Sequence, residues 1–197
     1  MLVATSFTKA AQASPVSEKK VSQIHKKLNL DGKLDFDVFY KAYKAYQNNS
    51  GKRKPLLTVI DYSKPSTEKR FFVLDLKNNK IVFNTYVSHG VNTGARDAKK
   101  FSNTVNSRKT SLGVFLTDKT YYGSNGYSLK LDGLSKGKND NARKRYIVVH
   151  GADYATESFI KRNGYLGRSW GCPAVPKEVA RKIIDTIKGG SVIYAYG

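Results

Sequence analysis

Two stretches in the first quarter of the chain carry apolar residues at the spacing of a helix. In the first, a spacing of three or four positions is kept by Val21, Ile24 and Leu28. The preceding Ser14-Pro15 supplies a capping residue and a proline suited to the first turn of a helix. Asp31-Gly32 follows as a helix breaker. The pattern therefore predicts a short amphipathic helix between these two signals.

The second stretch is an aromatic stripe that begins directly after Asp35. The carboxylate of Asp35 can accept hydrogen bonds from the free N–H groups of a first helical turn. The helix is expected to reach about residue 47, and its packing surface is formed by Phe36, Phe39, Tyr40 and Tyr43. The nearby acidic residues lack the spacing and the closing glutamate of a calcium loop, so no metal site is expected at Asp31, Asp35 and Asp37.

From Leu56 onward, the pattern changes to short runs of β-branched and aromatic residues separated by turn residues. The predicted strands cover 56–62, 70–76, 80–87, 110–117, 127–131, 145–149 and 191–196. Asn78-Asn79 predicts a tight turn between the second and third runs. A helix is predicted over 176–188, because a proline opens the segment and a glycine pair follows it. The fold class expected from these elements is mainly β (α+β).

A length of 197 residues suits one domain with a sizeable core. We divide the chain into residues 1–13, a helical segment with a polar linker over 14–55, and a main domain over 56–197. Within the main domain, residues 88–108 are polar and contain few large apolar side chains. Such a long loop in a compact domain is usually functional or mobile.

Composition adds a strong positive charge, because 35 Lys and Arg against 15 Asp and Glu give a net charge of +20. The resulting field concentrates anionic partners around the protein. Nucleic acid, anionic lipid and an acidic cell-wall polymer all fit this sign, as does a basic surface that serves only solubility. The positive residues are spread along the chain without an arginine-rich arm, so no specific nucleic-acid partner is expected.

The sequence also bears on location. No apolar run approaches the roughly 18 to 20 residues of a transmembrane helix, so no such segment is expected. Ala11-Gln12-Ala13 resembles the cleavage end of a signal peptide, although the first residues lack a basic region. Residues 1–13 are therefore either the remnant of a signal peptide or an ordinary flexible terminus.

The chain contains one cysteine, Cys172, and three histidines. A single cysteine excludes an intramolecular disulfide and any cysteine-based zinc site, since both need several sulfur atoms. Three histidines without a cluster of carboxylates argue against a metal hydrolase, and neither a metal nor a cofactor is expected. In an exported protein, an unpaired thiol is unusual and is more often kept for its reactivity.

Cys172 lies in the segment Gly167-Arg-Ser-Trp-Gly-Cys-Pro173, which is poor material for a core. A lone cysteine is more often a buried small hydrophobe than a nucleophile. Here, however, a nearby imidazole, a positive field and a helix start near Pro176 would each favour the thiolate. The N–H groups of Gly171 and Cys172 are candidate donors to an oxyanion. The setting makes Cys172 a candidate nucleophile.

Two of the histidines are candidates for the base. His150 follows the apolar run 146–149, which would display it at the rim of a sheet, where it can activate the thiol. The alternative is a histidine that is buried and hydrogen-bonded at a strand end. His89 also precedes a glycine after a predicted strand and is the second candidate. His25 falls on the first predicted helix and is expected to be structural or exposed.

Together these residues resemble the murein L,D-transpeptidases with a YkuD-like catalytic domain, whose signature is a strand-end histidine followed after a gap by Ser/Thr-His-Gly-Cys. Val149-His150-Gly151 matches the first part, and Ser169-Trp170-Gly171-Cys172 matches the second. The resemblance is strongest to a divergent branch with Gly-Arg-Ser-x-Gly-Cys-Pro. It covers most of residues 56–176 and includes Asp61-Tyr-Ser, Lys69-Arg-Phe-Phe-Val-Leu-Asp75, Val87-Ser-His-Gly90, Phe101-Ser-Asn103, Lys109-Thr-Ser-Leu-Gly113 and Leu131-Asp-Gly-Leu134.

The resemblance implies a β-sandwich of the L,D-transpeptidase type with two N-terminal helices packed on it. It also implies that Cys172, activated by His150, attacks the carbonyl of the third residue of a peptidoglycan stem tetrapeptide and expels the terminal D-alanine. An amine of a neighbouring stem or a water molecule then resolves the thioester. The outcome is a 3-3 cross-link or L,D-carboxypeptidase hydrolysis. Ser169 and Gly171 belong to the same catalytic motif.

Two positions depart from the pattern of the family. Trp170 stands where the signature has its second histidine, and Ala174 stands where an arginine or asparagine usually follows the cysteine by two residues. We therefore expect His89 to supply the second imidazole and Arg168 to contact a substrate carboxylate. With Trp170 and Gly151, they complete the expected substrate-binding set.

The sequence thus predicts a monomeric, exported enzyme of the periplasm or cell envelope that acts on peptidoglycan stem peptides. An alternative from another class is a non-catalytic relative that uses its charge to bind murein or other polyanions. A third alternative is a basic nucleic-acid binder, which would be retained on DNA or RNA in a strongly salt-dependent manner.

Overall fold

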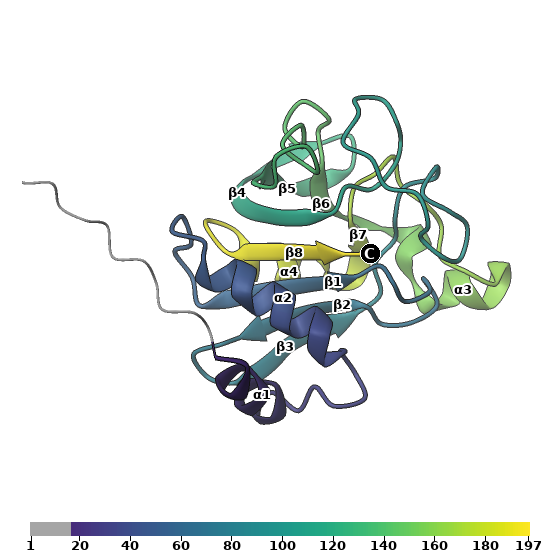
Figure 1. Ribbon diagram of the computed structural model, residues 1–197. Coiled ribbons are helices and arrows are strands. Elements are labelled where there is room, and N and C mark those ends of the chain that lie inside the picture. Colours follow the sequence, from purple (N-terminus) through teal and green to yellow (C-terminus); the bar gives the residue numbers. More distant parts are fainter. Residues whose placement is uncertain (1–16) are drawn as a thin grey trace, which may run out of the picture.

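The computed structural model describes residues 17–197 (Figure 1). It begins with helix α1 (Glu18–Lys27), in which Val21 and His25 are buried. His25 Nε2 lies 2.8 Å from the carbonyl oxygen of Leu34, so this histidine is structural rather than exposed. The predicted helix start at Ser14-Pro15 and the signal-like residues 1–13 lie outside the described part of the chain.

Helix α2 (Phe36–Gln47) carries the predicted aromatic stripe. Asp35 is its N-cap, as expected, and Oδ1 accepts hydrogen bonds from the backbone N–H groups of Asp37 at 2.8 Å and Val38 at 3.3 Å. These bonds satisfy two of the N–H groups that every helix start leaves without a partner inside the helix. The stripe faces the sheet, and Phe39 and Tyr43 of the predicted set are buried; Tyr46, which was not predicted, is buried next to Tyr43.

Replacing Asp35 with alanine is expected to lower the free energy of unfolding by about 1 kcal/mol, because both capping hydrogen bonds are lost. In a domain of this size, that loss corresponds to about 2 to 4 °C in the midpoint of thermal unfolding. Asp35→Asn keeps an acceptor oxygen at the same place and should unfold close to the unmodified chain. Thermal unfolding is measured by circular dichroism. An equal loss of stability in both variants would contradict the capping role.

Eight strands form one mixed sheet in the order β3-β2-β1-β8-β4-β5-β6-β7. Strand β1 pairs in parallel with β8, and β6 with β7, whereas the other neighbours are antiparallel. The mainly β fold with flanking helices that the sequence predicted is confirmed. The bounds of the strands are β1 (Leu56–Asp61), β2 (Phe71–Asp75), β3 (Lys80–Thr85), β4 (Gly113–Gly123), β5 (Gly126–Gly133), β6 (Val148–Ala152), β7 (Ala174–Pro176) and β8 (Val192–Tyr196).

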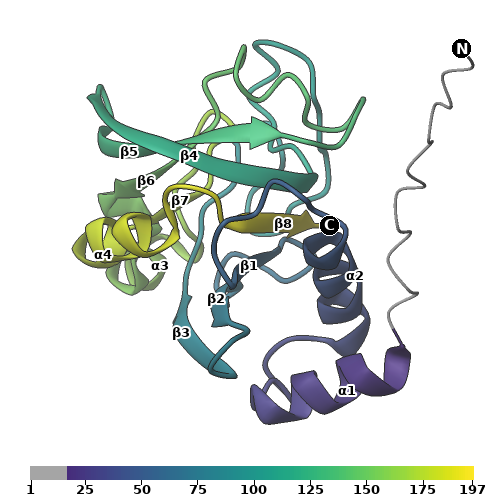
Figure 2. The same cartoon turned by 90° about the vertical axis from the view of Figure 1, so that its left-hand side faces the viewer.

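Strands β1 and β2 are buried on both faces, because alternate residues of a strand point to opposite sides of the sheet. One face packs against α1 and α2 through Leu57, Val59, Phe72 and Leu74. The other face shares a core with β5, β6 and α4 (Lys177–Ile187) through Ile60, Phe71 and Val73. Figure 2 shows α2 and α4 on opposite sides of β8. Since β1 and β2 meet β5 and β6 in one core, the sheet curves over on itself.

Two strands differ from their predicted bounds in ways that affect the site. Strand β4 runs to Gly123, well beyond the predicted run 110–117. Strand β6 begins at Val148 rather than at residue 145, because Tyr146 has a φ of 53°, a left-handed conformation that a strand residue does not adopt. It also continues through His150 to Ala152, so His150 lies within a strand and not at its end, which corrects the prediction.

Three short elements were not predicted. They are the 3₁₀ turn η1 (Asp153–Ala155), helix α3 (Glu157–Asn163) and strand β7. Helix α3 has ordinary boundary signals, since Thr156 Oγ1 accepts from the Phe159 N–H at 3.3 Å and Gly164 follows the helix with a φ of 81°. The segment between His150 and Cys172 is therefore partly helical.

The long loop 88–112 lies against the segment that carries the cysteine. Gly90 and Ser169 form an isolated β-bridge. On either side of it, the Ser169 N–H donates to the His89 carbonyl oxygen at 2.9 Å, and the Val91 N–H donates to the Ser169 carbonyl oxygen at 2.8 Å. The polar loop is thus held in contact with the candidate catalytic motif by the backbone itself.

Candidate active site

Cys172 and His150 are brought together by two neighbouring strands. Cys172 lies two residues before β7, and His150 lies in the middle of β6. The strands run in parallel, and His150 pairs with Ala174. Both side chains line one pocket with a volume of about 370 Å³. The structure therefore unites the nucleophile and the base that the sequence nominated, in a cavity that can admit a ligand.

The other walls of this pocket come from three segments of the chain. The segment before the cysteine contributes Arg168, Ser169 and Trp170, η1 contributes Tyr154, and the turn between β4 and β5 contributes Ser124 and Asn125. The sequence did not indicate the last three as site residues. Asn125-Gly126 is a strong hairpin signal, but no local feature shows that this turn reaches the cysteine.

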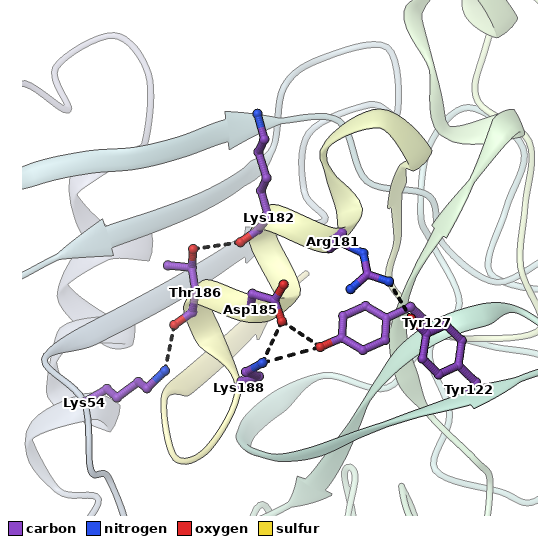
Figure 3. Close-up of polar contacts among 8 residues, drawn as sticks. All are labelled: Lys54, Tyr122, Tyr127, Arg181, Lys182, Asp185, Thr186 and Lys188. Atoms are coloured by element: carbon purple, nitrogen blue, oxygen red, sulfur yellow. Dashed lines mark hydrogen bonds and ion pairs between the residues drawn. The ribbon is translucent and has the colours of Figure 1, made fainter.

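The β4–β5 hairpin is fastened to α4 close to the turn that lines the pocket (Figure 3). Tyr127 Oη donates to Asp185 Oδ1 at 2.6 Å, and Lys188 Nζ donates to the same oxygen at 2.7 Å. Arg181 Nη2 donates to Tyr122 Oη at 2.5 Å, and its guanidinium lies 4.4 Å from the centroid of the Tyr127 ring. These contacts fix the position of the hairpin relative to the helix behind the site.

His150 has the tautomer that a general base requires. Its Nδ1 lies 3.0 Å from the Gly151 carbonyl oxygen, which can only accept, so Nδ1 carries the hydrogen and the lone pair is on Nε2. Burial lowers the pKa of His150, and the hydrogen bond to Gly151 opposes this only in part. At neutral pH, the imidazole is therefore uncharged and able to take up a proton.

Cys172 is a thiol at rest. Its side chain is 9% exposed, and Sγ lies 3.5 Å from the Tyr146 carbonyl oxygen, to which it donates. Burial raises the pKa of the Cys172 thiol, while the Val148 N–H and the Arg145 guanidinium pull the pKa back down. Tyr146, whose carbonyl oxygen accepts this bond, has a left-handed backbone conformation with a φ of 53°. The resting pair is thus a neutral thiol beside a neutral imidazole.

Ser169 organises the backbone around the cysteine. Its Oγ donates to the Cys172 carbonyl oxygen at 2.6 Å and accepts from the Gly171 N–H at 3.1 Å. The Gly171 N–H, one of the two predicted oxyanion donors, is therefore engaged by Ser169 in this conformation. The Cys172 N–H is the remaining candidate donor at this turn.

Gly171 needs the absence of a side chain on two counts. Its φ of 121° is a left-handed conformation that favours glycine. A Cβ at this position would also lie 2.7 Å from the Lys109 carbonyl oxygen and 3.2 Å from Arg145 Nη2. The tight turn before the cysteine therefore packs directly against the long loop and against Arg145.

His89 lies next to the motif through its backbone, but its imidazole is 1% exposed and points elsewhere. Arg70 Nη2 donates to Nδ1 at 2.7 Å, so Nε2 carries the hydrogen and donates to the Gly94 carbonyl oxygen at 3.2 Å. Burial, followed by the charge of Arg70, lowers the pKa of His89 to about 4. Both ring nitrogens are occupied, and His89 does not line the pocket of Cys172.

Stability is expected to fall as the pH drops from about 6.5 to about 4 because of His89. The unfolded chain takes up a proton near the usual pKa of 6.5, whereas the folded chain does so only near pH 4. Between these values the unfolded state binds more protons, and a shift of about 2.5 units corresponds to about 3 kcal/mol. Urea unfolding across this range measures the slope. His89→Gln should flatten it, and an unchanged slope would assign the effect to other groups.

The remaining predicted binding residues occupy different surroundings. Arg168 lines the pocket, and its guanidinium lies 5.5 Å from the centroid of the Tyr165 ring. Trp170 also lines it, is 71% exposed, and stacks with Arg108 at 4.3 Å. Gly151 does not line it. A Cβ there would lie 2.8 Å from that of Ala180, so Gly151 allows α4 to pack closely on β6.

Among residues 17–197, no group of three or more His, Cys, Asp and Glu side chains is arranged to hold a metal ion. In the same part of the chain, none of the helices combines the length and the apolar character needed to cross a membrane.

Among solved structures, the chain is similar to several L,D-transpeptidases. One is from Mycobacterium smegmatis, with 16% identity, 73% of this chain and 59% of that chain covered, and a TM-score of 0.45. Another is LdtMt1 in complex with imipenem, with 17% identity, coverage of 72% and 58%, and a TM-score of 0.43. A third is from Stackebrandtia nassauensis, with 14% identity, coverage of 90% and 76%, and a TM-score of 0.43. This chain thus spans under two thirds of the first two.

No curated protein matches the chain. Residues 30–196, in contrast, match the profile of a family described as the L,D-transpeptidase catalytic domain. This range leaves out α1 but includes α2, the entire sheet and every residue that lines the pocket of Cys172 and His150. The chain belongs to the L,D-transpeptidase catalytic domain family.

Proposed function

We propose that this chain is a cysteine acyltransferase of the periplasm or cell envelope that acts on peptidoglycan stem peptides, as an L,D-transpeptidase or an L,D-carboxypeptidase. The observation that carries the proposal is the pocket in which the only cysteine of the chain and a neutral His150 lie beside Arg168. Membership of the L,D-transpeptidase catalytic domain family supports the reaction class.

In the first half-reaction, Cys172 Sγ attacks the carbonyl carbon of the third stem residue while His150 Nε2 accepts the thiol proton. A sulfur–carbon bond forms, and the carbonyl electron pair moves onto the oxygen, where the Cys172 N–H donates to it. When the oxyanion collapses, the carbon–nitrogen bond to the terminal D-alanine breaks. The departing nitrogen takes the proton from His150, which leaves a thioester on Cys172.

In the second half-reaction, an amine of a neighbouring stem or a water molecule attacks the thioester, and His150 accepts its proton. The carbon–sulfur bond breaks, and the proton returns to Cys172 Sγ. An amine gives a new amide cross-link, whereas water gives a shortened stem with a free carboxylate. The two activities share every step until the acceptor enters, so one site supports both.

The other predicted site residues take supporting roles in this proposal. Arg168 offers a guanidinium at the pocket wall for a carboxylate of the stem peptide. Trp170 offers an exposed aromatic face at the same wall. His89 supports the backbone of the cysteine segment through its carbonyl group, and its neutral, doubly bonded imidazole argues for a structural part rather than a second base. Gly151 fixes the tautomer of His150 through its carbonyl oxygen.

The net charge of +20 agrees with a polyanionic cell-wall substrate but selects no individual contact. Specificity within this proposal therefore lies in the pocket, and the surface charge raises the rate of encounter.

Disaccharide tetrapeptides from purified murein, incubated with the protein and analysed by mass, test the proposal. Release of D-alanine with formation of dimers indicates a transpeptidase, and release of D-alanine alone indicates a carboxypeptidase. A carbapenem added to the same protein should give an intact-mass increase of one acyl group at Cys172. Absence of both turnover and adduct would leave the non-catalytic, murein-binding relative and overturn the proposal.

A further inference from the structure

Arg145 carries a positive charge that the protein does not neutralise. Its guanidinium donates only to uncharged oxygens of the long loop: Nη1 to the Ser102 carbonyl oxygen at 2.6 Å and to Ser111 Oγ, and Nη2 to the Lys109 carbonyl oxygen at 2.5 Å and to Ser107 Oγ at 3.2 Å. Throughout residues 17–197, no carboxylate forms an ion pair with it. Half-buried and without a counter-ion, this guanidinium sets up a local positive field.

Arg143, two residues earlier in the same turn, shows the contrast. Its guanidinium is bound by two carboxylates, through Nη2 to Asp118 Oδ2 at 2.5 Å and to Asp132 Oδ2 at 3.0 Å. The charge of Arg143 is therefore compensated where it stands. The two arginines differ in their electrostatic surroundings but not in their net charge, which makes Arg143 a matched control.

The uncompensated guanidinium lies beside the turn that carries the nucleophile. Arg145 Nη2 is 3.2 Å from the point that a Cβ of Gly171 would occupy, and Gly171 directly precedes Cys172. From the other side, the residue after Arg145 presents its carbonyl oxygen to the sulfur, since Tyr146 O lies 3.5 Å from Cys172 Sγ. The segment 145–146 thus flanks the cysteine with one charge and one acceptor.

We propose that Arg145 is a positioning residue for Cys172. Its uncompensated guanidinium stabilises the negative charge that develops on Sγ, and its hydrogen bonds hold the loop 102–111 against the turn at Gly171. This inference rests on the proposed function in that Cys172 is the nucleophile. It adds a source of thiolate stabilisation other than His150, which is neutral at rest and becomes charged only as it takes the proton.

The other ionisable groups near the sulfur do not supply this charge. Burial raises the pKa of Tyr62, and burial raises that of Tyr154 to about 12, so both phenols stay neutral. His150 is held neutral by burial. Arg168 lines the same pocket, but its guanidinium is directed to the Tyr165 ring. Burial raises the pKa of Cys172, and the Val148 N–H and the charge of Arg145 oppose this rise.

The effect of this charge on the ionisation of Cys172 can be measured without any substrate. Cys172 is the only cysteine of the chain, and it reacts with iodoacetamide as the thiolate. The rate of alkylation is followed by intact mass from mildly acidic to alkaline pH in the unmodified chain, Arg145→Gln, Arg145→Lys and Arg143→Gln. Arg145→Gln and Arg143→Gln lower the net charge equally, so any difference between them is local.

Arg145→Gln should shift the alkylation profile to higher pH, and below both midpoints its rate should fall by about tenfold or more for a shift of one pH unit or more. Arg145→Lys should lie closer to the unmodified chain, and Arg143→Gln should coincide with it. The limiting rate at high pH should not fall, because a thiolate of higher pKa is at least as nucleophilic. A role in folding alone would instead expose the thiol, which raises the alkylation rate at neutral pH and moves the midpoint down, because the effect of burial on the pKa of Cys172 is lost.

A midpoint in Arg145→Gln that coincides with that of the unmodified chain overturns the inference, as does an equal shift in Arg143→Gln. If Arg145→Gln does not fold, as judged by circular dichroism, Arg145→Met takes its place, since it also removes the charge and has a side chain of similar length. A raised midpoint in the folded Arg145→Met protein supports the role of the charge, and an unshifted midpoint refutes it. These outcomes leave the proposed function untouched, since that proposal fails only if turnover and acylation are both absent or do not depend on Cys172.

Discussion

Cys172→Ala is expected to abolish the release of D-alanine and the formation of cross-links, with a loss of about a thousandfold or more in turnover. The physical reason is that the thiol of Cys172 is the group that forms the acyl-enzyme in the proposed mechanism. Ser169 is the only hydroxyl group next to the cysteine in sequence, and its Oγ is engaged by the Cys172 carbonyl oxygen and the Gly171 N–H. Without the thiol, the two half-reactions lose their shared intermediate.

The fold should survive this change, because the side chain that is removed is small and makes a single weak hydrogen bond to the Tyr146 carbonyl oxygen. Turnover of murein tetrapeptides and carbapenem acylation are measured by mass, with circular dichroism as the check on folding. Cys172→Ser is the matched control: it keeps a nucleophilic atom of higher pKa and should bind substrate but turn over far more slowly. A Cys172→Ala protein that still trimmed or joined stem peptides would remove the cysteine from the mechanism.

His150→Gln is expected to lower turnover by about a hundredfold to ten-thousandfold, the usual contribution of a general base. Because burial lowers the pKa of His150, the unmodified enzyme should stay active below the ordinary pKa of histidine, where most imidazoles are already protonated. In the variant, activity should instead rise only at alkaline pH, where the buried thiol of Cys172 ionises by itself. Alkylation of the thiol at neutral pH should also slow.

The pH profile of turnover and the rate of iodoacetamide alkylation measure this prediction. His25→Gln serves as the control, since His25 lies on α1 and bonds to Leu34, outside the pocket. Unchanged alkylation at neutral pH in His150→Gln would exclude His150 as the activating base. Circular dichroism checks that both histidine variants remain folded.

Much of the architecture could be predicted from the periodicity of apolar residues. The aromatic stripe after Asp35 and its cap, the β-rich runs from Leu56, and the amphipathic helix before the last strand all appear in the structure. These predictions succeeded because each pattern is local and repeats over two or more turns or strand pairs. The order of strands in the sheet could not be predicted in the same way, since it depends on contacts between distant segments.

The backbone around Tyr146 could not be predicted from the local sequence. The run Tyr146-Ile-Val-Val149 has the composition of a strand, yet Tyr146 adopts a φ of 53° and β6 starts two residues later. Strand propensity reflects how side chains pack in a sheet. It contains no information on the Tyr146 carbonyl group, which accepts a hydrogen bond from Cys172 Sγ. For the same reason, Arg145 was predicted as the first residue of a strand, whereas it lies in the turn before β6, close to Cys172.

His89 illustrates a related limit. Its position after a strand and before a glycine matches that of His150, and the structure indeed brings its backbone to the cysteine segment. The direction of its imidazole is set by its hydrogen bond with Arg70, a fully buried side chain directly before β2. A sequence pattern can place a residue near a site, but tertiary packing determines which residue its side chain binds.

The position of β8 has a consequence for how the molecule is made. In the sheet, β8 alone joins the β3-β2-β1 half to the β4-β5-β6-β7 half, although it comes last in chain order. The first half carries α1 and α2, and the second half carries His150 and Cys172. The two halves therefore cannot join into one sheet during synthesis until residues 192–196 have emerged, and Cys172 becomes part of a complete fold only after translation has passed β8.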